Sequence, residues 1–140
     1  MQFPDKTPDA FNEFGEGYLP RLVGVEITNV SADKLEGRLT VRAELLAPNG
    51  YLHAATVIAL ADTLAGYGTI ANLPSGARGF TTIELKANFL GTARDGVVLC
   101  TATPVHLGAS THVWDAVVTD EASGRKIALF RCTQMILRNA

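Results

Sequence analysis

Charged residues are scarce in this chain of 140 residues. Asp, Glu, Lys and Arg make up 19% of the sequence, below the roughly 25% of an ordinary soluble domain. This scarcity favours a chain that buries part of its surface against a partner. The densest basic stretch is Arg125–Lys126. Because no basic patch is present, nucleic acid is not expected as a partner.

Cysteines and long apolar segments are scarce too. Cys100 and Cys132 each lie in an apolar, strand-like run, with no CxxC pair and no Cys/His pair at metal-ligand spacing. We therefore expect two reduced core cysteines and no metal site. The first 14 residues lack the basic and apolar segments of a secretory leader. No apolar run reaches the ~18 residues that a membrane span requires. A cytoplasmic protein with no membrane partner is the expectation.

Periodic patterns predict helices and strands along a single domain, residues 1–140. Residues 35–44 alternate apolar and polar side chains, which is typical of an antiparallel strand with one solvated face. Residues 53–72 show no alternation, and apolar residues surround the whole helical wheel, which indicates a helix buried on nearly all sides. The other predictions are a short helix at 8–16, one more turn at 19–22, and strands at 23–30, 80–90, 97–107, 111–120 and 126–137.

The order of these elements predicts the fold class. The linkers GAS and EASG between the last three strands have hairpin length, and the last four strands are predicted to form a meander. A long apolar helix cannot bury itself, whereas an antiparallel sheet with one apolar face can wrap it. We therefore predict an α+β fold, a curved antiparallel sheet wrapped round a long central helix.

Asp62 is the one charged residue within this apolar helix. Burying an unpaired carboxylate is costly, and apolar surroundings shift carboxyl pKa values, as at many catalytic sites. Asp62 is therefore the first candidate for a catalytic group. The alternative is an Asp62 that faces solvent, or that pairs with arginine or a backbone N–H group at an interface.

His53 stands where the predicted helix begins. The first N–H groups of a helix have no partners within it, so the amide of Ala54 or Ala55 is suited to polarise a carbonyl oxygen. The alternative for His53 is a helix cap or a surface histidine. His53 and Asp62 are nine residues apart, about 13.5 Å along a helix and about half a turn around it. Only two antiparallel copies of the helix bring both groups to one substrate, which predicts a dimer with shared sites.

The residues around this helix resemble a known family. Gly50–Ala55, Leu60–Thr63 and Gly66 are similar to the central-helix motif of hot-dog-fold acyl-CoA thioesterases, of the phenylacetate-degradation and 4-hydroxybenzoyl-CoA type. Their common pattern is Gly-x-x-His-Gly-Gly, with Asp or Glu nine residues after the His. The runs 81–90, 105–108 and 132–137 are similar to later strands of that family, and the resemblance covers residues 22–138.

The resemblance implies hydrolysis of an acyl-CoA to free acid and CoA by a homo-oligomer, a dimer of dimers, without a cofactor. Asp62 would be the general base or the nucleophile, and both stay open. The Ala54 amide would bind the thioester oxygen, and His53 would hydrogen-bond the thioester or fix the loop. Thr82 matches the position that holds the attacking water or the acid.

Two departures from the family pattern concern carbonyl binding. Ala54–Ala55 replaces the usual Gly-Gly, and the added methyl groups narrow the approach to the thioester. Ala47 stands where many members have Asn or Gln, and Asn49 is the nearest substitute.

Other residues are candidates for binding the substrate. The CoA phosphates call for cations, and Arg78 and Arg94 are the candidates, with solvated loop charges as the alternative reading. Tyr51, Leu52 and Phe80 are candidates for the apolar acyl pocket, whereas strand alternation assigns Trp114 and Phe130 to the core. The substrate-binding set is Asn49, Gly50, Tyr51, Arg78, Arg94, Gly108 and Ser110.

Two further functions remain open as alternatives. A hydratase or dehydratase acting on acyl thioesters pairs His with Asp within a motif of different spacing, which this sequence lacks. A non-catalytic acyl-CoA-binding protein is the second alternative, because of the Ala54–Ala55 departure. Both aromatic and short to medium aliphatic acyl groups fit the sequence.

Overall fold

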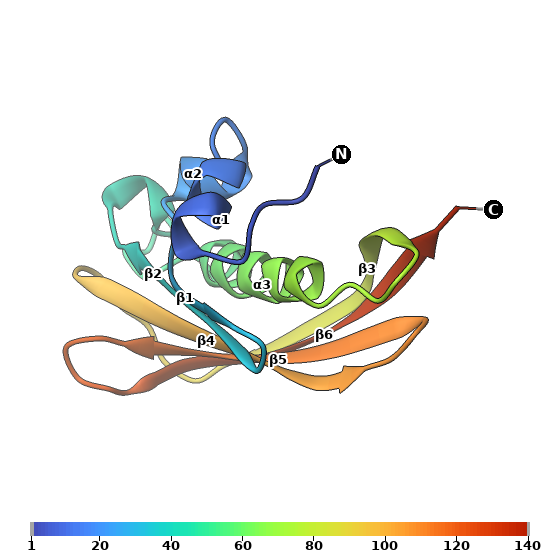
Figure 1. Cartoon of the computed structure of the whole chain (residues 1–140). Coiled ribbons are helices and arrows are strands. Elements are labelled where there is room, and N and C mark those ends of the chain that lie inside the picture. Colours follow the sequence, from blue (N-terminus) through green and yellow to red (C-terminus); the bar gives the residue numbers. More distant parts are fainter. Residues whose placement is uncertain (1, 140) are drawn as a thin grey trace.

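A computed structural model describes residues 2–139 and shows a six-stranded antiparallel sheet curved around one long helix (Figure 1). This architecture confirms the predicted fold class. The elements in chain order are α1 (Pro8–Phe14), α2 (Leu19–Val23), β1 (Glu26–Ser31), β2 (Lys34–Thr40), the short 3-10 helix η1 (Ala43–Leu45), α3 (Ala54–Ala71), β3 (Ala77–Phe89), β4 (Val97–Leu107), β5 (Thr111–Asp120) and β6 (Lys126–Arg138).

The two short helices cover the side of α3 that faces away from the sheet (Figure 1). α1 begins where the Thr7 side chain accepts a hydrogen bond from the Ala10 amide at 3.2 Å, as a helix cap does. Phe11 is fully buried, and its ring lies 4.9 Å from that of Tyr67 on α3. Gly24 ends α2 with a φ of 89°, a conformation that favours glycine.

The strand order is β1-β2-β4-β5-β6-β3. The predicted meander is therefore right for β4, β5 and β6 and wrong for β3, which pairs with β6 at the far edge. The linker after β3 is longer than a hairpin turn, and it crosses the start of α3. There the Leu52 amide donates to the Ala93 carbonyl and to the Thr92 hydroxyl, both at 3.1 Å.

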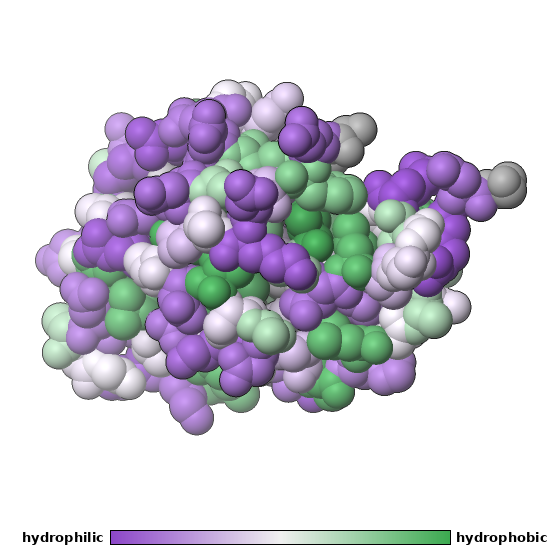
Figure 2. All heavy atoms as spheres, in the orientation of Figure 1, coloured by the Kyte–Doolittle hydropathy of each residue, from purple (hydrophilic) through white to green (hydrophobic). Residues whose placement is uncertain are grey.

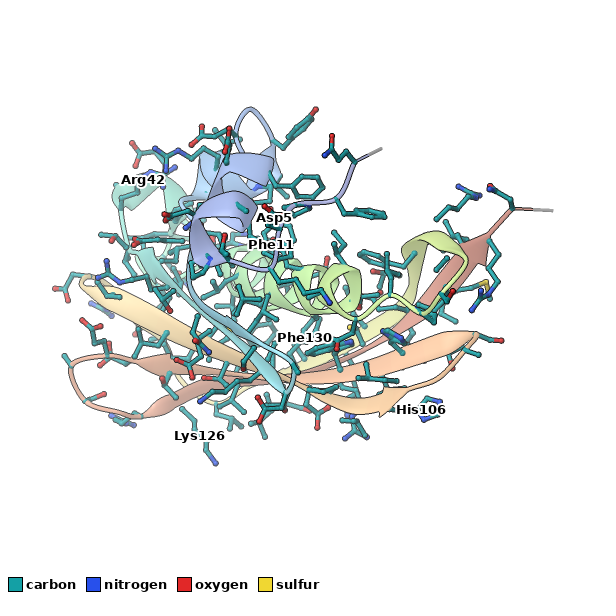
Figure 3. The ribbon with its side chains drawn as sticks, viewed as in Figure 1. Asp5, Phe11, Arg42, His106, Lys126 and Phe130 are labelled. Carbon is teal, nitrogen blue, oxygen red and sulfur yellow. The ribbon has the colours of Figure 1, made fainter. Side chains whose placement is uncertain are left out.

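The core lies between the sheet and α3. Strand alternation turns Trp114 and Phe130 inward, as predicted, and both are buried. Phe130 lies between β6 and α3, whereas Lys126 and His106 point away from the molecule (Figure 3). Leu60 and Leu64 of α3 have no exposed surface, and burying each such side chain contributes about 1.5–3 kcal/mol.

The expectation that α3 is buried on nearly all sides is wrong for its first half. Ala54 and Ala55 are exposed, and Ile58, Ala59 and Asp62 are half-buried. The sheet covers one side of the helix and α1 and α2 cover another, so one face stays open in the single chain. The alternation predicted for residues 35–44 also ends early. Ala43 lies beyond β2, at an exposed position in η1.

α3 is long and apolar enough to cross a membrane by length and composition alone, with a mean hydropathy of 1.3 over its 18 residues. Asp62 and three threonines interrupt its apolar residues, so it is not the uninterrupted apolar run whose absence the sequence predicted. Within the fold, 61% of this helix is buried, the pattern expected of a core helix.

Gly68 permits the close contact between α3 and the sheet. A Cβ atom at Gly68 would lie 2.5 Å from Cη2 of the fully buried Trp114. We expect Gly68→Ala to destabilise the protein by about 1–3 kcal/mol, because the ring has nowhere to move. Gly66→Ala is the control: its Cβ would lie 3.1 Å from Cζ of the half-buried Phe80. Urea unfolding of both variants measures the difference, and an equal loss of stability would contradict this account.

Candidate functional site

Asp62 lies on the open face of α3. The residue is half-buried, and its Oδ1 atom is inaccessible to solvent and has no hydrogen-bond partner among residues 2–139. Burial raises the pKa of this carboxyl group above its ordinary value. A carboxylate held in this way is suited to accept a proton or to attack an electrophile.

The side chains facing Asp62 come from the β3–β6 edge of the sheet. Cys132 on β6 is buried, and burial, together with the nearby Asp62 charge, raises the pKa of its thiol to about 12. Gly66, one helical turn after Asp62, contacts Phe80 on β3. Asp62 therefore points toward the edge that β3 forms, away from the N-terminal helices.

His53 caps the start of α3. Its Nδ1 atom accepts a hydrogen bond from the Ala55 amide at 2.9 Å. This bond requires Nδ1 to be unprotonated, so Nε2 carries the proton of the neutral ring and is a donor. The Ala55 amide is thereby occupied. The Ala54 amide has no acceptor within the described part of the chain, so of the two amides considered, only Ala54 is free to bind a carbonyl oxygen.

The loop before α3 is ordered by its own hydrogen bonds. The Ala47 amide donates to the Tyr51 carbonyl at 2.7 Å, and the Gly50 amide donates to the Ala47 carbonyl at 2.9 Å. Asn49 accepts from the Tyr51 amide at 3.1 Å, so its side-chain oxygen supports the turn. The Arg94 guanidinium lies over the Tyr51 ring, 4.3 Å from its centroid.

The predicted substrate-binding residues form two groups at opposite ends of α3. Asn49, Gly50, Tyr51 and Arg94 lie at its beginning, as the loop contacts show. The other group lies at the end where β3 starts and β4 turns into β5: Ile136 donates to the Ser110 carbonyl, and Ala77 pairs with Arg138. Arg78, Gly108 and Ser110 belong to this second group.

A single chain also leaves the proposed reacting groups apart. Ala54 and Asp62 are separated by eight residues of continuous helix, which is about 12 Å along the axis. The free amide and the buried carboxylate therefore do not face one substrate within one chain.

Thr82 contacts a residue that the sequence analysis missed. Its hydroxyl donates to Oε1 of Gln134 at 2.6 Å. Gln134 has no exposed surface, and its Nε2 atom has no partner among residues 2–139. The sequence did contain a signal for this residue, because Gln134 occupies a position of β6 where the alternation predicts an inward-facing side chain, and a polar side chain there is unusual.

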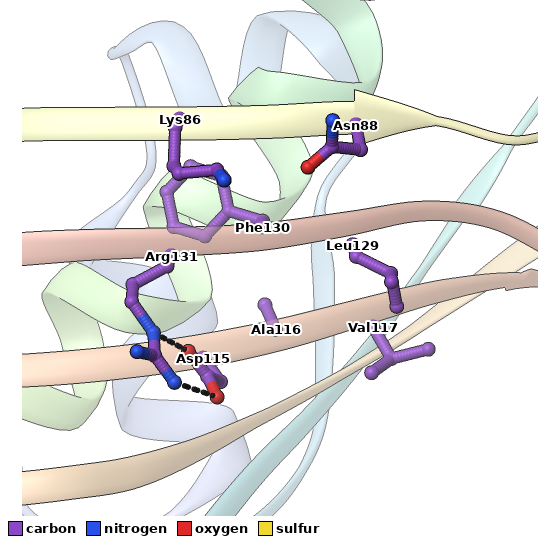
Figure 4. Close-up of a pocket in the computed structure, with 8 residues that line it drawn as sticks. All are labelled: Lys86, Asn88, Asp115, Ala116, Val117, Leu129, Phe130 and Arg131. Atoms are coloured by element: carbon purple, nitrogen blue, oxygen red, sulfur yellow. Dashed lines mark hydrogen bonds and ion pairs between the residues drawn. The ribbon is translucent and has the colours of Figure 1, made fainter.

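Two hollows lie away from Asp62. One, of about 350 Å³, is on the outer face of the sheet, where Arg131 forms two hydrogen bonds with Asp115 (Figure 4). The other, of about 370 Å³, is lined by Thr92, Arg125 and Lys126 near the start of α3. Arg125 and Lys126, the densest basic stretch of the sequence, therefore lie beside the linker after β3 that contacts the start of α3. No group of three potential metal ligands occurs within residues 2–139.

Asp62 is expected to reduce the stability of the protein. Its pKa is higher in the folded than in the unfolded chain, so the folded chain binds the proton more tightly. Its contribution therefore favours folding at low pH and is lost as the pH rises through the folded pKa. We expect Asp62→Asn to raise the urea midpoint at pH 7 and to lose that advantage below about pH 4, near the unfolded pKa.

The exposed Asp95 provides the control for this prediction. Asp95→Asn is expected to leave the urea midpoint unchanged at both pH values. An Asp62→Asn variant that is less stable than the wild type at pH 7 would show that the carboxylate is stabilised rather than strained.

The chain is similar to known thioesterases. Residues 49–127 match the family described as the Thioesterase superfamily. A 1,4-dihydroxy-2-naphthoyl-CoA hydrolase of Listeria monocytogenes is 33% identical over 82% of this chain and 92% of its own. The protein of the same name from Escherichia coli is 30% identical over 94% and 95%. The crystal structure of a mutant thioesterase from Pseudomonas aeruginosa superposes with a TM-score of 0.88, at 26% identity over 97% of this chain and 96% of that one.

Proposed function

Because this chain belongs to the thioesterase superfamily of hot-dog-fold enzymes, we propose that it hydrolyses an acyl-CoA thioester, with Asp62 as the reacting carboxylate. The observation that carries the proposal is the unpaired, buried Oδ1 atom of Asp62 on the open face of α3. The proposal places the enzyme in the cytoplasm and requires no cofactor.

The proposed chemistry begins at the carbonyl group of the thioester. The Ala54 amide donates a hydrogen bond to the carbonyl oxygen and stabilises the negative charge that develops there. As a general base, Asp62 takes a proton from water while the water oxygen attacks the carbonyl carbon; the tetrahedral intermediate then collapses, the C–S bond breaks, and the leaving CoA thiolate takes up a proton. As a nucleophile, Asp62 attacks that carbon itself, the CoA thiolate leaves, and water then hydrolyses the mixed anhydride. Both routes yield the free acid and CoA.

The site is proposed to form between two copies of the chain. β3 is an edge strand that exposes 54% of Ile83, 38% of Leu85 and 46% of Phe89. Such an edge is suited to pair with a second strand. Figure 2 shows apolar residues at the surface around α3, between the N-terminal helices and the β3–β6 edge. Pairing of two β3 strands about a two-fold axis sets the two α3 helices antiparallel, with Ala54 of the partner subunit beside Asp62.

A complementation experiment tests the shared site. Ala54→Pro removes the amide hydrogen at the first helical position, which proline tolerates well. We expect it to lower kcat about 10²–10³-fold, whereas Ala54→Gly keeps the amide and the activity. Asp62→Asn is expected to be inactive. When the two inactive variants are refolded together, random pairing gives one site in four both intact groups, so about a quarter of the activity returns. If no activity returned, the Ala54 amide and the Asp62 carboxylate would have to act within one chain.

The acyl group is proposed to be aromatic or short to medium aliphatic. The relatives from Listeria and Escherichia are named for an aromatic acyl-CoA, and the half-buried Phe80 and exposed Tyr51 offer aromatic walls. Arg94 and Arg78 are proposed to meet the CoA phosphates. The outer face of the sheet exposes Leu129 and Met135, which supports a dimer of dimers joined there.

A panel of acyl-CoA substrates tests the function itself. We expect thiol release, followed with a thiol-reactive dye, from at least one aromatic or aliphatic acyl-CoA. Asp62→Asn should abolish the release while binding of the same acyl-CoA, measured by calorimetry, is retained. Binding without thiol release from any substrate would contradict hydrolysis and favour a binding protein.

A further inference from the structure

His112 and Gln134 face each other in the sheet, and each carries a buried polar atom without a partner. The two residues are direct cross-strand neighbours on β5 and β6. Both lie on the inner face, with 1% of His112 and none of Gln134 exposed. Neither Nδ1 of His112 nor Nε2 of Gln134 has a hydrogen-bond partner among residues 2–139, so the two atoms do not bond each other either. Buried polar groups are nearly always paired, and two facing groups left unpaired call for an explanation.

The two atoms offer opposite halves of a hydrogen bond. The Thr82 hydroxyl donates to Oε1 of Gln134 at 2.6 Å, which leaves the NH₂ group, a donor, as the free end of this amide. Burial lowers the pKa of His112, and the nearby His106 lowers it further, so the imidazole is neutral at pH 7. With its proton on Nε2, the neutral ring presents Nδ1 as an acceptor. A donor and an acceptor therefore face each other across the two strands.

The polar side chains in the second half of α3 do not serve this pair. The Thr69 hydroxyl donates to the Ala65 carbonyl at 3.0 Å, and the Asn72 amide donates to the Gly68 carbonyl at 2.9 Å. Both bonds stay within the helix. The group that would satisfy the pair must accept one hydrogen bond and donate another, and a hydroxyl group does both.

The pair lies one step along the sheet from the proposed reacting group. Cys132 precedes Gln134 by two residues on the same inner face of β6. It is close enough to Asp62 that burial and, after it, the Asp62 charge raise the pKa of the Cys132 thiol. Two residues along a strand span about 6.6 Å. An aromatic ring or a short chain attached to a thioester carbon beside Asp62 is long enough to bring its far end to the pair.

Phe80 lies beside the path from Asp62 to the pair. Its ring is half-buried and reaches from β3 to α3, where a Cβ atom at Gly66 would lie 3.1 Å from Cζ. Gly66 comes one helical turn after Asp62, and Phe80 comes two residues before Thr82 on β3. An acyl group that enters from the open face of α3 therefore passes along an aromatic ring before its far end meets polar atoms.

We propose that His112 and Gln134 determine the specificity for the acyl group by binding a hydroxyl group at its far end. The hydroxyl oxygen accepts a hydrogen bond from the Gln134 NH₂ group, and the hydroxyl donates its own hydrogen to Nδ1 of His112. A hydrocarbon end would leave both polar groups unpaired and is therefore disfavoured. The inference rests on the proposed function in placing the thioester carbon beside Asp62, and it narrows the acyl group to one with a hydroxyl opposite the thioester.

Three matched acyl-CoA substrates test the inference. 4-Hydroxybenzoyl-CoA carries a hydroxyl at the far end of the ring, 2-hydroxybenzoyl-CoA carries it next to the thioester, and benzoyl-CoA lacks it. We expect the wild type to favour the 4-hydroxy compound over the other two by about 10–100-fold in kcat/KM, measured by thiol release. Gln134→Met and His112→Leu remove the donor and the acceptor at similar side-chain size, and each should reduce this preference to about threefold or less.

Two further variants separate recognition of the hydroxyl from a loss of packing. Val118→Ala trims a fully buried side chain on the inner face of β5, and it is expected to lower the melting temperature while the preference stays as in the wild type. His112→Asn keeps an acceptor near the position of Nδ1, and it should retain more of the preference than His112→Leu.

Binding measurements distinguish a failure of this inference from a failure of the proposed hydrolysis. The probes are non-hydrolysable analogues of the 4-hydroxybenzoyl and benzoyl compounds, in which a methylene group replaces the thioester sulfur. Calorimetry is expected to show about tenfold tighter binding of the hydroxylated analogue to the wild type, and no such difference with Gln134→Met. A binding preference without thiol release from any substrate would contradict hydrolysis and leave the inference standing.

Two outcomes would overturn the inference. One is equal binding of the two analogues by the wild type, which would mean that the pair holds only a water molecule. The other is a preference for the hydroxylated analogue that survives in both folded variants, Gln134→Met and His112→Leu, which would place the hydroxyl elsewhere.

Discussion

Everything in this structure depends on one helix that is covered on two sides and left open on a third. The sheet and the N-terminal helices bury Leu60 and Leu64 completely. The open face carries Ala54, Ala55, Ile58 and Ala59 together with the half-buried Asp62. The apolar contacts fix the helix firmly enough to hold a carboxylate where water reaches it poorly, and the burial of Leu60 and Leu64 offsets the cost of that desolvation.

The length of the helix is the physical reason for proposing a site shared between two chains. A free amide exists only at the start of a helix, because later amides bond within it. A carboxylate at that start would face solvent, whereas the covered middle of α3 provides the burial that raises the pKa of Asp62. One chain therefore offers the free amide of Ala54 and the buried carboxylate of Asp62 about 12 Å apart. In the proposed dimer, a two-fold axis would bring the start of one helix beside the middle of the other.

Local patterns predicted the elements well because each depends on neighbouring residues. The alternation along β2 and the limits of α3, with His53 and Asn72 at its ends, follow from the sequence alone. The position of β3 in the sheet could not be predicted from the sequence. A strand shows the same alternation of inward and outward side chains whether it lies at the edge of the sheet or beside β4. The pairing of β3 with β6 depends on a linker that crosses the start of α3. The contact between Gln134 and Thr82 was missed for a related reason, since it depends on the register of β3 against β6.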